Sequence, residues 1–352
     1  MTNLCIFVYT KFKDAKLKNF KIFIFLFLSI SSCNTKKEIQ EFVIAFGSCN
    51  NQILENTLWE EIKKNEPDVW IWGGDNIYSD TEDMNYLKQN YLRQKRKKDY
   101  TDFIKNVDVL GTWDDHDYGM NDGGFEYIKK EESQQLFLDF MDVKKNDKRR
   151  LQKGVYFSKE YKFNEKSIKI ILLDTRYFRT ALTPDNETDK RYKPNEYGEG
   201  TILGETQWEW LKNELKNSTS SFNIIVSSIQ FLSFEHGFET WGNMPHEVDK
   251  LENLITSTKA KNVIILSGDR HISEISKKQI EGNSYPLIDF TSSGLTHSYT
   301  DFNEEINPYR VGNVISKKSF GILKFERNSN AIRMEARGEN NVIYEFYLQN
   351  YN

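Results

Sequence analysis

Short apolar runs alternate with polar clusters along most of the chain. Six such runs cover residues 42–46, 69–72, 107–113, 168–173, 223–227 and 263–266. Runs of this length that end in turn-forming or charged residues are typical of buried β-strands. The segments between them carry apolar residues at helical spacing, as at Leu54, Leu58 and Ile62. This alternation predicts an α/β fold in which helices cover both faces of the sheet.

The pattern changes toward the C-terminus, where residues 320–348 alternate apolar and polar positions. Such alternation is typical of antiparallel strands, and we expect these strands to complete a second sheet. Residues 183–200 contain two prolines and many charges, which predicts a long surface loop close to the site. The sequence from Glu41 onward has no Pro/Gly/Ser-rich linker and no internal repeat, so residues 34–352 are expected to form one domain.

Residues 1–33 have a different character. Five lysines between positions 11 and 21 precede the apolar run 22–28, which is followed by Ile30-Ser31-Ser32-Cys33. The apolar stretch of roughly 11 residues is too short to span a bilayer and suits the core of a signal peptide. Its end resembles a bacterial lipobox, in which the cysteine is acylated and becomes the mature N-terminus; an ordinary signal peptide or an unprocessed anchor is the alternative. We therefore expect an exported protein of the cell envelope, periplasmic or in the outer membrane, held to the membrane only by a lipid on Cys33.

Composition and charge narrow the function only slightly. The chain is 38% hydrophobic and 14% aromatic, which is enough for a substantial core, and its formal net charge is −4. That charge excludes a nucleic-acid binder held by a bulk positive field. The cysteine count is more informative, because Cys5 and Cys33 belong to the export segment and Cys49 would be the one thiol of the mature domain. Cys49 is then a buried bystander, a reactive thiol or a metal ligand.

The polar clusters after the apolar runs contain the residue types that bind metals. Ligands of α/β sheets bind beyond the carboxyl ends of the strands, and carboxylate oxygens and imidazole nitrogens suit hard or borderline cations. The candidates at these positions are Asp75, Asp114, Asp115, His116, Asp117, Asn121, Asp269 and His271. Asp269 and His271 could reach two metals from a single turn, and Tyr78 could direct its oxygen to the same centre as Asp75. These positions predict a metal site at one edge of the sheet.

Several of these clusters, in this order, resemble the PhoD-type alkaline phosphatases of the metallophosphoesterase superfamily. The motifs are Gly47-Ser48-Cys49, Gly74-Asp75-Asn76-Ile77-Tyr78, Trp113-Asp114-Asp115-His116-Asp117, Leu173-Asp174-Thr175-Arg176 and Gly268-Asp269-Arg270-His271. The resemblance extends from about residue 42 to residue 297, most of the mature chain. It implies a catalytic domain over residues 34–352 with a two-layer β-sheet sandwich flanked by helices and a site at the carboxyl ends of the strands.

The resemblance also implies roles for particular residues. Cys49, Asp75, Tyr78 and His271 would hold ferric iron. Asp75, Asn121 and Asp269 would hold calcium, with Asp75 bridging the two ions and Asp115 as a further candidate; other divalent metals are possible. Arg176 would contact the phosphoryl oxygens. His116 could protonate the leaving group or orient a ligand.

This set of residues is chemically coherent for the hydrolysis of a small-molecule phosphate ester. A metal-bound hydroxide would attack phosphorus in line with the leaving oxygen, while the second metal and Arg176 stabilise the charge on the equatorial oxygens. Three alternatives stay open. Arg176 could instead form an ion pair with Asp174 or Asp289, Cys49 could be a packing residue beside two identical metals, and the whole chain could be a non-catalytic cell-surface binding protein on a phosphatase scaffold.

Overall fold

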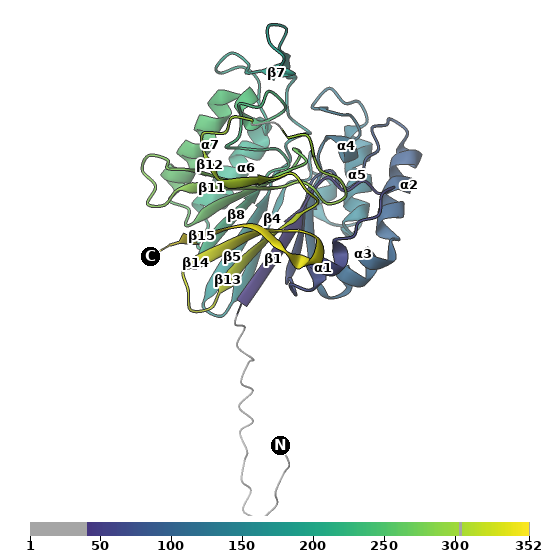
Figure 1. Cartoon of the computed structure of the whole chain (residues 1–352). Helices are drawn as coiled ribbons and strands as arrows, with labels where there is room; N and C mark the ends of the chain where they lie inside the picture. The colour runs from purple at the N-terminus through teal and green to yellow at the C-terminus, as the bar shows by residue number, and fades with distance from the viewer. Residues whose placement is uncertain (1–40, 303–304, 352) are drawn as a thin grey trace, which may run out of the picture. The chain divides into compact units, whose positions relative to one another are not determined.

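The computed structural model of the chain describes residues 41–302 and 305–351, which form two large β-sheets (Figure 1). The first sheet has the strand order β15-β14-β13-β1-β2-β3. Its strands are β1 (Glu41–Gly47), β2 (Val69–Gly73), β3 (Asp108–Thr112), β13 (Phe320–Glu326), β14 (Ala331–Arg337) and β15 (Ile343–Asn350). The first three run parallel to one another, and β13 pairs antiparallel with β1.

The second sheet has seven strands in the order β12-β10-β11-β9-β8-β5-β4. They are β4 (Phe157–Phe163), β5 (Lys166–Leu172), β8 (Phe222–Val226), β9 (Val263–Ser267), β10 (Ser273–Lys278), β11 (Leu287–Ser292) and β12 (Arg310–Ile315). The inner strands β5, β8, β9 and β11 are parallel. The expectation for the C-terminal segment was therefore right about its antiparallel strands and wrong about their sheet, since β13–β15 extend the sheet that contains β1.

Helices cover the outer face of each sheet (Figure 1). The α-helices are α1 (Trp59–Lys63), α2 (Met84–Lys95), α3 (Lys98–Phe103), α4 (Asp115–Tyr118), α5 (Lys130–Phe140), α6 (Gly204–Lys216) and α7 (Pro245–Thr258). Short 3-10 helices lie at Ile104–Asn106, Lys148–Arg150, Trp241–Asn243 and Glu339–Asn341. The layers are thus helix, sheet, sheet and helix, which confirms the sandwich that the resemblance implies. The expectation of helices on both faces of one sheet was wrong, because the inner face of each sheet packs against the other sheet. Within the described residues no helix is long and apolar enough to cross a membrane.

The strand sequences are almost continuously apolar because successive side chains point to opposite faces of the sheet and both faces are buried. In β2, Val69 and Ile71 point into the core between the sheets, whereas Trp70 and Trp72 pack under the helices. Both faces of the strand are buried, so neither face needs polar residues. Across the central core the rings of Phe46 and Phe290 meet edge to face with centroids 4.9 Å apart, which joins the two sheets. Burying one such side chain contributes about 1.5–3 kcal/mol.

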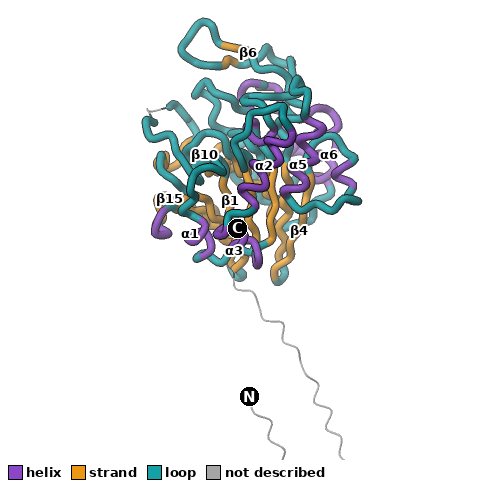
Figure 2. Tube along the Cα trace, turned by 90° about the vertical axis from the view of Figure 1, so that its right-hand side faces the viewer, coloured by secondary structure: helices purple, strands orange, loops and turns teal. Residues whose placement is uncertain are grey.

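The parallel strands place their carboxyl ends at one end of the molecule. The chain enters β1 at the lower edge in Figure 1, so the loops that follow β1, β2 and β3 lie at the opposite edge. Figure 2 shows a small hairpin of β6 (Thr183–Pro184) and β7 (Tyr192–Lys193) projecting at this upper end. The predicted long loop over residues 183–200 is thus partly a hairpin. The export segment with Cys33 lies outside the described residues.

Candidate metal centre

Four of the predicted ligands lie on turns with an unusual backbone conformation. Cys49, Asp75, Asp269 and His271 have φ angles of +59°, +49°, +70° and +55°. Residues with side chains adopt this left-handed region at an energetic cost, which native structures tolerate mainly at functional sites. The first two residues follow neighbouring parallel strands, and a hydrogen bond of 2.8 Å from the Asn50 amide to the Asp75 carbonyl joins their turns. The local backbone thus turns side chains from several strands toward one point.

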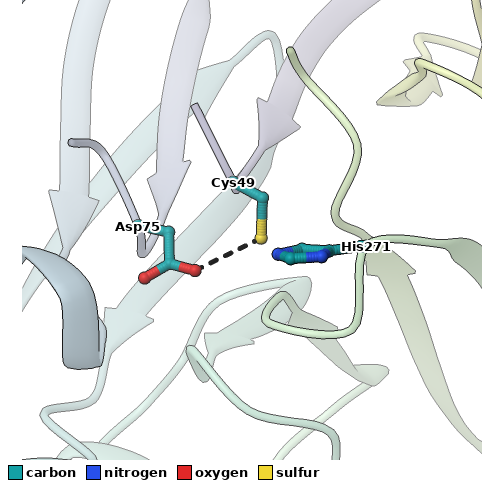
Figure 3. Close-up of side chains that lie close together, drawn as sticks. All are labelled: Cys49, Asp75 and His271. Atoms are coloured by element: carbon teal, nitrogen blue, oxygen red, sulfur yellow. Dashed lines mark hydrogen bonds between the residues drawn. The ribbon is translucent and has the colours of Figure 1, made fainter. Parts of the chain in front are cut away.

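The first ligand group combines a thiol, a carboxylate, a phenol and an imidazole. Cys49 Sγ lies 3.3 Å from Asp75 Oδ2. The Tyr78 hydroxyl lies 3.2 Å from the same carboxylate oxygen and 3.0 Å from His271 Nε2. Figure 3 shows Cys49 and Asp75 reaching the site from adjacent strand ends, with the His271 ring facing them from the other side. The ligand atoms of Cys49, Asp75 and His271 lie within 4.8 Å of one another.

The protonation states of this group depend on the cation. Burial, together with the neighbouring His297, lowers the pKa of His271 to about 4, so its imidazole is neutral and can bind a metal. Burial raises the pKa of Cys49 to about 11, although a hydrogen bond with Ser293 opposes the shift. The thiolate form therefore requires a positive charge beside it, as a bound metal would provide.

The second ligand group is a cluster of buried carboxylates. Oxygens of Asp75, Asp114, Asp115 and Asp269 lie within 4.8 Å of one another. Burial and the neighbouring carboxylates raise the pKa of Asp75 and of Asp269 well above the usual range. In the described part of the chain, Asp75 Oδ1 and Asp114 Oδ2 are buried without a hydrogen-bond partner. Unpaired buried charges of one sign are costly, so the cluster fits cations, and Asp75 belongs to both groups.

His116 lies beside this cluster at the start of α4. Its Nδ1 is 2.6 Å from Asp80 Oδ2, and its ring stacks against Tyr78 with centroids 4.2 Å apart. Burial alone would lower the pKa of His116, but the charges of Asp75, Asp80 and Asp115 raise it to about 11. The ring therefore holds a proton in the metal-free protein. Asp115 accepts hydrogen bonds from the backbone amides of His116 and Asp122, at 2.9 and 2.7 Å.

Arg176 occupies a different environment from the one expected. Its guanidinium is fully buried, with an exposed fraction of 0%, and it pairs with Asp114 and with Glu239, the latter at 2.5 Å. Glu239 also pairs with Arg179 at 2.9 Å. The alternative prediction that Arg176 forms an ion pair was right, but its predicted partners, Asp174 and Asp289, were wrong. Asp174 accepts hydrogen bonds from the backbone amides of Val155, Arg176 and Tyr177. Asp289 accepts from the Ser267 hydroxyl and from two backbone amides. Contact with phosphoryl oxygens stays a prediction.

A cavity of about 260 Å³ opens beside the two ligand groups. It is lined by Asp115, His116, Asn121, Asp122, Arg191, Phe238, Glu239, Asp269, Arg270, His271 and Tyr299. Asn121 is exposed on this wall, in reach of the cavity, and its assignment as a ligand stays a prediction. The residues Arg191 and Arg270 were not expected here. Both could have been inferred, because Arg270 stands between two predicted ligands and Arg191 belongs to the loop 183–200 that was expected close to the site.

His297, from a loop expected at the rim of the site, also lies at the centre, although it was not among the predicted ligands. Its ring centroid lies 4.4 Å from that of His271 and 5.2 Å from that of Tyr78. Its Nδ1 is 3.0 Å from the Thr296 hydroxyl, which fixes the ring against the first ligand group. His297 follows no apolar strand directly, so the strand-end rule could not find it.

The fold and the site together define the class of the protein. A dimetal phosphatase from Danio rerio has a similar fold, with a TM-score of 0.52 at 13% identity over 88% of this chain and 99% of that one. The two sheets carry overlapping ligand groups at their strand ends, an arrangement that fits two cations. Residues 44–343 match the family described as PhoD-like phosphatase, and the chain belongs to this family.

Two further comparisons agree with this family. A solved structure of PhoD superposes with a TM-score of 0.70 at 17% identity, covering 89% of this chain and 69% of that chain. Alkaline phosphatase D of Bacillus subtilis (strain 168) is 30% identical over 122 residues. That match covers 31% of this chain and only 20% of the relative, about a fifth of its length.

Proposed function

We propose that the protein is an exported, metal-dependent hydrolase of small-molecule phosphate esters. One observation carries the proposal. Asp75 belongs to two overlapping ligand groups, one with a thiol and an imidazole and one with three further carboxylates, and both adjoin a cavity at the strand ends. Two cations that share a carboxylate are the arrangement that can hold a phosphate ester and activate water beside it.

The donor types suggest which residues would hold each cation. Cys49, Asp75, Tyr78 and His271 would hold ferric iron, as the family resemblance implies, because thiolate and phenolate stabilise that charge. Asp75, Asn121, Asp269 and the candidate Asp115 offer oxygen ligands, which suit calcium or another hard divalent ion. When bound, the pair would supply Lewis-acid polarisation of the phosphoryl group and a lowered pKa for coordinated water.

We assign His116 the role of proton donor to the leaving group. Asp80 binds Nδ1 at 2.6 Å and fixes the ring, which leaves Nε2 as the atom that can donate to a leaving oxygen. Arg176 is a positioning residue, since its ion pair holds Asp114 in place beside Asp115.

A non-catalytic binding protein on the same scaffold is the second candidate. It would gain nothing from three buried carboxylates and one half-buried carboxylate within 4.8 Å of one another, because without cations their mutual repulsion destabilises the fold. The complete ligand set therefore favours the enzyme.

The test uses residues 34–352, which include the compact unit Ile39–Asn352, purified without chelator. We expect near-stoichiometric iron with calcium, a visible charge-transfer band, and hydrolysis of p-nitrophenyl phosphate or bis(p-nitrophenyl) phosphate. Tyr78→Phe should abolish the band, whereas Tyr100→Phe, which removes a buried hydroxyl that bonds Trp72 outside the site, should keep it. Iron and activity that persist in Cys49→Ser would make Cys49 a packing residue. A metal-free protein that stays inactive with iron, calcium, zinc or manganese would favour the binding protein.

Export is supported by the basic segment, the apolar run 22–28 and the lipobox-like end at Cys33. Full-length protein expressed in a bacterium should be found in the membrane fraction and incorporate labelled palmitate. Cys33→Ala should lose the label. A protein that stays in the cytosol with its N-terminus intact would contradict the proposal.

A further inference from the structure

Two guanidinium groups from distant segments line the cavity beside the ligand groups. Arg270 stands between Asp269 and His271, and Arg191 comes from the hairpin of β6 and β7. Arg176, the arginine expected to bind phosphate, is sealed in its ion pairs, so these two are the guanidinium groups that face this cavity among the described residues. What they recognise depends on the proposed function, since they matter to catalysis only if the site hydrolyses phosphate esters.

The guanidinium group of Arg270 is fixed in position, but not all of its hydrogen-bond donors have a partner. Its side chain is 8% exposed, and Nη2 bonds Glu305 Oε1 at 2.8 Å. The guanidinium carbon lies 4.1 Å from the centroid of the Phe238 ring, a cation–π contact that fixes its plane. Its Nε is buried and has no hydrogen-bond partner within the described parts of the chain. A buried donor without a partner costs free energy, and an anionic oxygen in the adjoining cavity would satisfy it.

Arg191 is held at the cavity by the turn after α4. Its Nη2 lies 2.6 Å from Asp122 Oδ2, and the Tyr192 hydroxyl donates to the same oxygen at 2.7 Å. The Asp122 amide in turn donates to Asp115 Oδ2 at 2.7 Å. The hairpin is thereby connected through one residue to a candidate ligand. With a side chain 51% exposed, Arg191 keeps donors available to a bound anion.

The cavity continues past these residues, away from the ligand groups. A second cavity of about 510 Å³ is lined by Thr188, Asp189, Lys190, Arg191, His236 and Phe238. It has Arg191 and Phe238 in common with the first, and we refer to the two adjoining cavities together as the groove. The stem of Lys190 lies over Gly237, where a Cβ would come within 2.5 Å of it, so the absence of a side chain at Gly237 makes room for a third cation. The outer cavity therefore carries two basic side chains, Lys190 and Arg191, beside one acidic side chain, Asp189.

We propose that this groove binds a second phosphate carried by the leaving group of the substrate. The ester phosphate belongs at the ligand groups, and Arg270 and Arg191 lie between them and the outer cavity, where a further phosphate would meet Lys190. Guanidinium groups bind phosphate through paired hydrogen bonds. The partly exposed rings of Phe238 and Tyr299 offer an apolar wall for the atoms that separate the two phosphates. The preferred substrates are therefore organic bisphosphates rather than esters of uncharged alcohols.

The test compares fructose 1,6-bisphosphate with fructose 6-phosphate by kcat/KM, counted per phosphate, with the metal-loaded protein. We expect a preference of about tenfold or more for the bisphosphate, as a new charge-assisted hydrogen bond would give. Arg191→Gln and Arg270→Gln should each reduce this ratio toward one. Lys193→Gln removes a charge from the same hairpin, where Lys193 pairs with Glu187 and lines neither cavity, and should keep the ratio.

The outcomes separate this inference from the proposed function. A wild-type protein that hydrolyses p-nitrophenyl phosphate but shows no preference for the bisphosphate overturns the inference and leaves the function intact. A protein that hydrolyses none of the esters would contradict the proposed hydrolase function. Calorimetric titration with pyrophosphate and with phosphate would then test whether the groove binds anions. Tighter binding of pyrophosphate, lost in Arg191→Gln, supports an anion groove, whereas equal affinities overturn it. Circular dichroism of each variant checks that it is folded.

Discussion

At the scale of single residues, Arg176 illustrates how burial decides a role. A guanidinium enclosed between Asp114 and Glu239 stabilises the fold by pairing two buried carboxylates. Arg176→Met removes the ion-pair partner of Asp114 and leaves Glu239 with Arg179 alone. We expect it to lower the free energy of unfolding by about 3–5 kcal/mol, measured by urea denaturation. Lys63→Met, which removes an exposed partner of Glu60, should leave it nearly unchanged. Unaltered unfolding with a raised KM for p-nitrophenyl phosphate would instead make Arg176 a substrate contact.

Asp289 on β11 should make stability depend on pH. Burial raises its pKa to about 6, although Ser267 and the amides of Leu232 and Phe231 oppose the shift. The folded protein then binds this proton more tightly than the unfolded chain, so the contribution of Asp289 to stability falls as the pH rises from about 4 to 6 and is constant above that range. The shift corresponds to about 3 kcal/mol.

The variant Asp289→Asn should remove most of that fall, as urea denaturation in chelator at several pH values would measure. Chelator keeps metal loss from contributing to the curve. Asp102→Asn is the control of opposite sign, because Lys105 and Lys98 hold the pKa of Asp102 below its usual value and its contribution is lost as the pH falls. An unchanged curve for Asp289→Asn would show that Asp289 is ionised in the folded protein at low pH.

The sequence identified the ligand-type residues because each follows an apolar strand at a turn. The structure brings Cys49, Asp75, Tyr78 and His271 together as the motif order implied. The sequence could not give the partners of Arg176, because Glu239 lies 63 residues away in a loop whose sequence carries no periodic pattern. Side-chain pairing across loops depends on tertiary packing, which no local pattern encodes.

At the scale of elements, the two sheets meet most closely at the turn after β9. A Cβ on Gly268 would lie 2.6 Å from Ser48 Oγ and 2.7 Å from the Gly73 carbonyl oxygen. Gly268→Ala should therefore push the turns of β1 and β9 apart, cost about 1–3 kcal/mol of stability and weaken metal binding. Urea denaturation and a metal titration would measure the two effects. Gly73→Ala is the matched control, because its Cβ would meet nothing closer than 3.5 Å. Equal losses in both variants would contradict the steric argument.

The strands were more predictable than their arrangement into sheets. Apolar runs such as 69–72 match β2 because a strand buried on both faces needs apolar residues throughout. The assignment of β13–β15 to the sheet of β1 depends on long-range pairing, for instance of Ala45 with Ile322, and alternation alone does not specify it. The short strands β6 and β7 were missed because two residues each are too few for a periodic signal.

At the scale of the whole molecule, the metal centre would act as a link between the two sheets. Cys49 and Asp75 follow strands of the first sheet, and Asp269 and His271 follow a strand of the second. Cations bound by both pairs would hold the strand ends together and neutralise the carboxylates between them. A ligand that binds only the folded state stabilises it by mass action, by about 4 kcal/mol at a thousandfold excess over its Kd.

Removal of the metals should therefore lower the melting temperature by about 10 °C for a domain of this size. Calorimetry with and without chelator measures the change, and re-addition of iron and calcium should reverse it. Hydrogen exchange should rise in the turns after β1, β2 and β9, while the central core around Phe46 and Phe290 stays protected. Asp269→Ala should lose only part of this difference, because His271 of the same sheet still belongs to the group with Cys49 and Asp75. If chelation leaves the wild-type melting temperature unchanged, the two sheets do not depend on the metals, and the central core alone holds them together.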